Sequence, residues 1–128
     1  MKYHFQNYEK RELNKKTIND KIAAKIVQSH VNKLRDLAVK IEAYHLKTAM
    51  ALMLLAKFGR PGGSFINSRI NLYESHLKGG GIIKNDLNKA VQLLLPHLAI
   101  LKTIRSEIEN SDLEIKKILD KLINLCEI

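Results

Sequence analysis

Apolar residues recur at alternating steps of three and four along the first half of the chain, and this spacing constrains the fold more than any other feature. The apolar positions are Ala24, Val27, Val31, Leu34, Ala38, Ile41, Leu52 and Leu55, and the polar His45 and Thr48 continue the same spacing between Ile41 and Leu52. Such steps return to one face of an α-helix, whereas a half-buried strand needs alternation by two. No segment sustains that alternation, so the sequence predicts an all-α fold.

Glycine and proline divide the rest of the chain into helices. The six glycines lie within residues 59–63 and 79–81, where helical patterns end. Pro96 lies inside a later pattern and should kink it, because proline lacks a backbone donor. We expect a bundle of four to five helices, with a first helix that is long or broken near residue 30 and a Pro-kinked fourth helix. The expected patterns cover about 17–57, 65–78, 85–109 and 111–128.

The length of 128 residues suits one domain. Residues 1–16 look like a separate arm, because Tyr3, Phe5 and Tyr8 are interleaved there with basic residues. Residues 17–128 are expected to form a single helical-bundle domain. The arm could stack on the bases of a nucleic acid, or it could dock its aromatic rings into a groove of its own or a neighbouring bundle.

Several features predict a cytoplasmic protein. The longest apolar run, Ala49–Ala56, is far shorter than a membrane span requires. The N-terminus lacks the apolar segment of a signal peptide. Cys126 is the single cysteine, which excludes an intramolecular disulfide and favours a reducing compartment.

The net charge is +9, and the excess is unevenly distributed along the chain. Lys and Arg outnumber Asp and Glu by seven to three in residues 1–25 and by ten to four in residues 26–100, but residues 101–128 carry five against six. A basic excess confined to part of a small domain favours a polyanionic partner, because the summed field retains phosphate-rich ligands.

The basic residues that we expect to contact such a partner include a helical stripe and a loop residue. Lys33, Lys40 and Lys47 are one heptad apart and would form one cationic stripe on a continuous helix. Arg60 lies in a glycine-rich loop that could approach phosphate closely. The full set of predicted contact residues is Lys10, Arg11, Lys33, Arg35, Lys40, Lys47, Arg60 and Arg69.

No metal or cofactor site is expected. Glu42 and His45 form half of the motif that carboxylate-bridged di-iron bundles use, but a second copy on another helix is missing. His45 is instead expected to be a hydrogen-bonded histidine of the helical seam that shares polar contacts with Thr48.

Arg69 and His76 fit a spacing that is similar to the Arg and His pair of the HEPN ribonucleases, which are also helical. Those enzymes place both side chains on one helix face to engage the scissile phosphate. The resemblance therefore implies a ribonuclease that uses Arg69 and His76. The residue after the arginine, usually polar in that family, is Ile70 here.

The sequence leaves three functions open. The first is a non-enzymatic accessory protein that binds nucleic-acid backbone with little sequence specificity, similar in kind to the small helical subunits of RNA-guided effector complexes. The second is a structural or adaptor subunit, because the apolar stretches Ala49–Ala56 and Val91–Leu101 could be partly covered by a protein partner or a second copy. The third is the HEPN-like ribonuclease.

Overall fold

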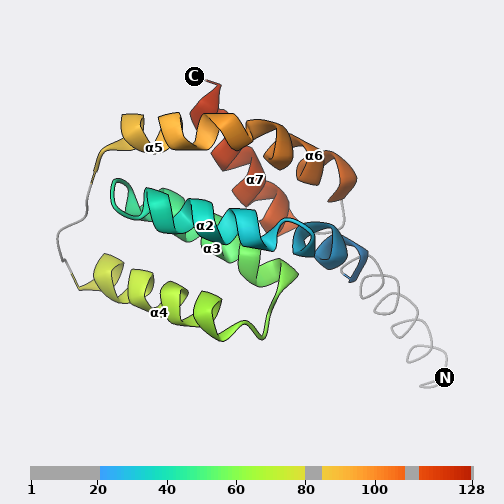
Figure 1. Ribbon diagram of the computed structural model, residues 1–128, viewed down its shortest axis with the longest axis horizontal. Coiled ribbons are helices and arrows are strands. Elements are labelled where there is room, and N and C mark those ends of the chain that lie inside the picture. Colours follow the sequence, from blue (N-terminus) through green and yellow to red (C-terminus); the bar gives the residue numbers. More distant parts are fainter. Residues whose placement is uncertain (1–20, 80–84, 109–112, 128) are drawn as a thin grey trace, which may run out of the picture.

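The computed structural model describes residues 21–79, 85–108 and 113–127, and these are all-helical apart from short connections. Residues 21–28 are helical and lead into the labelled helices of Figure 1. These are α2 (Val31–Ile41), α3 (Leu46–Gly59), α4 (Ser64–Lys78), α5 (Leu87–Leu94), the 3-10 turn η1 (Leu95–His97), α6 (Leu98–Ile108) and α7 (Leu113–Cys126). The expected N-terminal arm, with Lys10 and Arg11, and the expected helix start at Ser111 lie outside the described residues.

The predicted first helix is broken twice. The break near residue 30 is present, since Ser29 and His30 form a turn before α2. A second break at residues 42–44, which the sequence analysis did not predict, folds α2 and α3 into a hairpin. His45 begins α3 in an extended conformation, and its side chain accepts a hydrogen bond from the Thr48 backbone N–H at 3.2 Å. This side-chain cap stabilises a new helix start within what looks like continuous periodicity.

The segment around Pro96 also differs from a single kinked helix. η1 separates α5 from α6 there, because a proline ring cannot donate the hydrogen bond that would continue α5. Asp86 rather than Asn85 is the cap of α5, and its carboxylate accepts from the Lys89 backbone N–H at 3.1 Å. With these breaks, the described residues contain six labelled α-helices instead of four to five.

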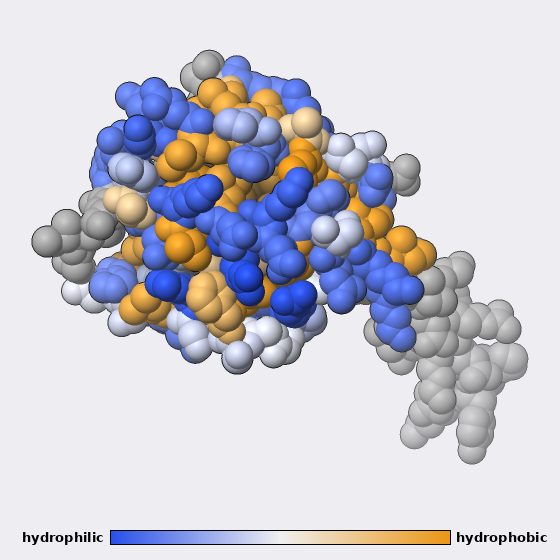
Figure 2. Space-filling view, in the orientation of Figure 1, coloured by the Kyte–Doolittle hydropathy of each residue, from blue (hydrophilic) through white to orange (hydrophobic). Residues whose placement is uncertain are grey.

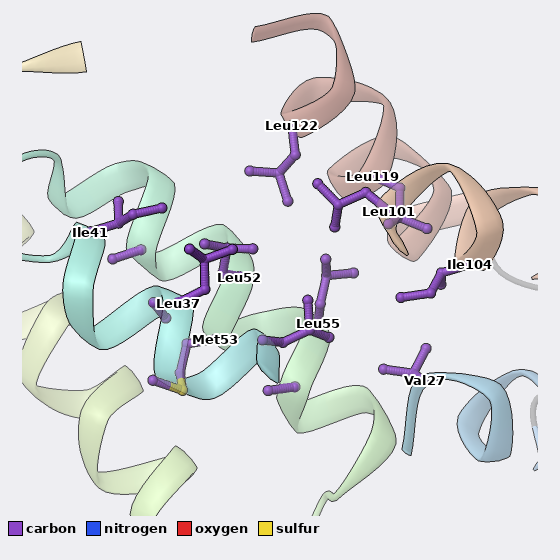
Figure 3. Close-up of a cluster of buried hydrophobic side chains, with 14 of the residues drawn as sticks. Val27, Leu37, Ile41, Leu52, Met53, Leu55, Leu101, Ile104, Leu119 and Leu122 are labelled. Atoms are coloured by element: carbon purple, nitrogen blue, oxygen red, sulfur yellow. The ribbon is translucent and has the colours of Figure 1, made fainter. Parts of the chain in front are cut away.

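Helix α3 lies at the centre of the bundle, with α2, α4 and α7 packed against it. Figure 1 shows α5 and α6 on one side of the α2–α3 hairpin and α4 on the other. In Figure 3, Leu52 and Leu55 of α3 point toward Leu101 of α6 and Leu119 of α7. Most of the apolar surface of α3 is thus covered by this chain's own helices, while Leu54 and Phe58 line an open groove. No described helix is long and apolar enough to cross a membrane.

Candidate nucleic-acid interface

Helix α4 lies at one side of the bundle (Figure 1) and buries only three side chains, those of Ile66, Ile70 and Tyr73. It packs on α3, but the polar contacts that fix its position run to α2. The face over α2, next to α4, is rich in hydrophilic side chains in Figure 2.

Two arginines stack on one exposed aromatic ring at this face. The guanidinium carbon of Arg35, from α2, lies 5.1 Å from the centroid of the Phe65 ring, and that of Arg69, from α4, lies 5.4 Å away. Both distances are within cation–π range. Phe65 remains 42% exposed, so it is a platform that solvent or a ligand can reach. We call these three residues the arginine–phenylalanine stack.

The Glu42 carboxylate, near the end of α2, holds the middle of α4. It accepts a hydrogen bond from Arg69 Nη1 at 3.2 Å on one oxygen and a short hydrogen bond from the Tyr73 hydroxyl on the other. Burial and then the hydrogen bond to Glu42 raise the pKa of Tyr73 well above its usual value, so the phenol remains the donor. Arg69 therefore contacts both the Glu42 carboxylate and the ring of Phe65 in the arginine–phenylalanine stack.

The start of α4 adds to the positive potential. Its N-cap Gly63 provides no side-chain acceptor, and its first turn contains no acidic residue. The aliphatic part of Arg60 lies against Gly63, because a Cβ built there would be 3.3 Å from Arg60 Cγ and Cδ. A helix N-terminus carries partial positive charge, so Arg60 and the backbone reinforce each other here.

A pocket of about 320 Å³ lies between α2 and α4, and Glu42 and Tyr73 are among the residues that line it. Arg69, Tyr73 and His76 follow one another at steps of four and three and so share one face of α4. Glu42 faces them from α2. The pocket is lined by Val39, Glu42, Leu46, Leu72, Tyr73 and His76.

The predicted basic residues do not form one surface. Arg35 contacts α4, whereas Lys33 lines a small hollow with His97 of η1 on the opposite flank of α2. Lys40 is seven residues from Lys33 and shares that flank. Lys47 follows the break and lies near His45 together with Lys121 of α7. The stripe expected from Lys33 to Lys47 is therefore wrong, because the chain reverses at residues 42–44.

Only two of the predicted contact residues within the described ranges have a carboxylate partner within 4.0 Å. Arg69 pairs with Glu42 at 3.2 Å, and Arg35 lies 3.9 Å from the exposed carboxylate of Asp36. The other four described members of the set have no such partner among the described residues. These are Lys33, Lys40, Lys47 and Arg60.

The sequence analysis missed Phe65, Glu42 and Tyr73 as members of this site. Phe65 could have been found, because it lies four residues before Arg69 and neighbours it on any helix. The Glu42 contacts with Arg69 and Tyr73 span 27 and 31 residues, respectively. No local sequence pattern predicts these two contacts.

His45 has the predicted contact with Thr48, with its Nδ1 lying 2.7 Å from Thr48 Oγ1. Because Nδ1 also accepts from the Thr48 backbone N–H, the cap requires an unprotonated Nδ1. Burial, followed by repulsion from Lys47 and Lys121, lowers the pKa of His45 below 6.5. The unfolded chain therefore binds a proton at a higher pH than the folded chain does.

Acid is accordingly expected to destabilise the fold through His45. As pH falls below 6.5, the unfolded state gains this proton first and the free energy of unfolding decreases. A His45→Asn variant keeps a capping side chain that does not titrate, so its urea midpoint should change less between neutral pH and pH about 5. The control is His76→Asn, which replaces an exposed histidine and should behave as the parent does. Equal acid sensitivity in the parent and in His45→Asn would contradict this account.

The other groups that could support chemistry are few. Burial, and then the neighbouring Glu127, raise the pKa of the Cys126 thiol, which makes it a poor nucleophile. Within residues 21–79, 85–108 and 113–127, no three His, Cys, Asp or Glu side chains are grouped to hold a metal ion.

No known protein family, curated protein or solved structure matches the chain.

Proposed function

We propose that this chain is a non-enzymatic helical protein that binds nucleic-acid backbone, and that the α2–α4 face is its contact surface. The observation that carries the proposal is the arginine–phenylalanine stack, with two guanidinium groups beside one exposed ring. Proteins that hold single strands combine an aromatic platform for a base with cations for the adjoining phosphates. The stack supplies both within one small area, which favours single-stranded over duplex ligands.

Donor capacity supports the same interpretation. A guanidinium has five N–H donors, and Arg69 uses one of them for its hydrogen bond to Glu42. Arg60 adds a second forked donor beside the uncapped start of α4. Together with Arg35, they make three arginines that can bind phosphate oxygens around Phe65. Their planar guanidinium groups can form bidentate contacts with phosphate, which the point charge of a lysine cannot.

Binding is expected to depend steeply on salt and on Phe65. If three phosphates are neutralised, raising salt from about 50 to about 200 mM should weaken binding to single-stranded RNA about 20-fold. Phe65→Ala should weaken it about tenfold or more, because one stacked base is lost. Fluorescence anisotropy with a labelled oligouridylate measures both effects.

Arg35→Ala and Arg105→Ala form the matched pair for this experiment. Both remove one positive charge, but Arg105 lies on α6 and pairs with Asp120 of α7. Arg35→Ala should weaken binding severalfold and reduce the salt slope by about 0.7, while Arg105→Ala should change neither. Equal losses in the two variants would mean that net charge alone attracts the RNA, and the proposed surface would be rejected.

The ribonuclease alternative is supported by the shared face of Arg69, Tyr73 and His76 on α4. It differs from the proposal in the fate of the ligand, so the labelled RNA from the binding assay can be run on a denaturing gel. Non-enzymatic binding leaves the RNA intact. Cleavage that disappears in an Arg69→Ala/His76→Ala variant would replace the proposed function by the enzymatic one.

The adaptor alternative rests on the apolar stretches Ala49–Ala56 and Val91–Leu101. In the first stretch, Ala49, Leu52, Met53, Leu55 and Ala56 are buried in this chain's own core, whereas Leu54 is partly exposed beside a groove. In the second stretch, Leu95 is 46% exposed, whereas Leu94 and Leu101 are buried. A concentration-independent monomeric mass in light scattering would count against self-association.

A further inference from the structure

The pocket between α2 and α4 has a composition suited to one flat, polar-edged ring. Val39, Leu46 and Leu72 supply apolar walls, and the Glu42 carboxylate supplies an anionic acceptor. Its volume of about 320 Å³ is at the lower end of the range for small-ligand sites. Leu72 is 44% exposed and His76 is exposed, so the mouth opens along α4.

The Glu42 carboxylate retains unused acceptor capacity. An ionised carboxylate offers about four lone-pair positions, and here Arg69 takes one on the first oxygen while Tyr73 takes one on the second. Each oxygen can therefore accept one further hydrogen bond. Two parallel acceptors of this kind match a ligand edge with two adjacent N–H donors.

Among the four standard RNA bases, guanine alone presents two adjacent donors, N1–H and the N2 amine, on its Watson–Crick edge. Adenine and cytosine offer one amine next to a ring-nitrogen acceptor, which would face the second carboxylate oxygen unfavourably. Uracil offers one N–H between two carbonyls. Proteins read unstacked bases in single-stranded RNA through such edge contacts.

We propose that the pocket is a guanine subsite, in which the Glu42 carboxylate accepts from N1–H and N2–H of a base splayed out of a single strand bound at the arginine–phenylalanine stack. This inference rests on the proposed function. Arg69 connects the two parts, since the same guanidinium lies over Phe65 and bonds to Glu42. Phe65 of the stack and Tyr73 of the pocket are both on α4, eight residues or ~12 Å apart along the helix. The protein would thus bind most of the strand through its backbone and recognise a single base, guanine, specifically.

The test compares three labelled oligonucleotides that differ at one central nucleotide: uridine, guanosine or inosine. Inosine keeps N1–H and lacks the N2 amine, so it removes one of the two proposed hydrogen bonds and leaves the protein unchanged. The guanosine oligomer should bind about tenfold more tightly than oligouridylate, because a bidentate base contact discriminates by about that factor. The inosine oligomer should lose most of this preference.

Two variants locate the preference in the pocket. Glu42→Gln exchanges one acceptor for a donor and should abolish the guanosine preference. Leu72→Trp fills the mouth from an exposed position, does not replace any group bonded to Glu42, and should abolish the preference even if Glu42→Gln folds poorly. A far-ultraviolet circular dichroism spectrum equal to that of the parent shows that Leu72→Trp is folded.

The outcomes separate the two proposals. Equal affinity for all three oligomers, with binding still sensitive to salt and to Phe65→Ala, overturns the guanine subsite and leaves the proposed function standing. Equal preference for inosine and guanosine also overturns it, because the N2 contact is then absent. Failure of every oligomer to bind overturns both proposals.

Discussion

Replacing Leu55 by alanine is expected to lower the free energy of unfolding by about 3 to 4 kcal/mol. Leu55 is fully buried in the central helix, and Figure 3 shows it within the cluster that α3, α6 and α7 build together. Truncation removes methyl groups from water-free surroundings and leaves a cavity that three packed helices cannot easily close. Urea denaturation followed by circular dichroism measures the loss.

Leu54→Ala is the control for this prediction. Leu54 precedes Leu55 on the same helix, so the substitution changes helix propensity equally, but its side chain is only partly buried beside an open groove. It should cost about 1 kcal/mol. If the two variants lose the same amount, α3 is not the central helix of the core.

Replacing Gly59 by alanine is expected to destabilise the chain by about 2 to 3 kcal/mol. Gly59 ends α3 and is buried against the turn before α2. A Cβ there would lie 2.8 Å from the Gln28 backbone nitrogen and 2.8 Å from Val31 Cγ2. The backbone of Gln28 cannot rotate away as a flexible side chain does. The end of α3 must therefore move away from the chain at Gln28 and Val31. The midpoint of urea unfolding should therefore fall.

Gly62→Ala provides a matched control three residues later in the sequence. No atom lies within 4 Å of a Cβ built at Gly62, and its φ is outside the left-handed region. Alanine there should leave stability unchanged or raise it by about 0.5 kcal/mol, because it restricts only the unfolded chain. A destabilisation as large as that of Gly59→Ala would show that loop glycines matter for another reason than close packing.

The helical class and much of the core could be predicted from the sequence, because burial follows a period that only a helix produces. Val27, Val31, Leu34, Leu52 and Leu55 are all buried, as their spacing predicts. The hairpin could not be predicted in this way. The seam keeps its register across residues 42–44, so the apolar pattern is the same whether the chain continues or reverses, and the deciding contact is the cap from His45.

Like the fold, the candidate site could be predicted from the sequence only in part. The neighbourhood of Phe65 and Arg69 is local to one helix and follows from their spacing of four. Whether Arg35 reaches that ring depends on how α2 and α4 cross, which no periodicity encodes. Arg35 and Lys33 are two positions apart on α2, and this rotation of about 200° sends them to different sides of the molecule.

The shallow attachment of α4 has a consequence for hydrogen exchange. With three buried side chains and a polar clasp at Glu42, this helix should open at a lower free energy than α3, and its amides should exchange well before those of the core. A strand bound across Arg35, Phe65 and Arg69 would tie the helix back to α2. Binding of the strand should then slow amide hydrogen exchange along α4, the helix that contacts it.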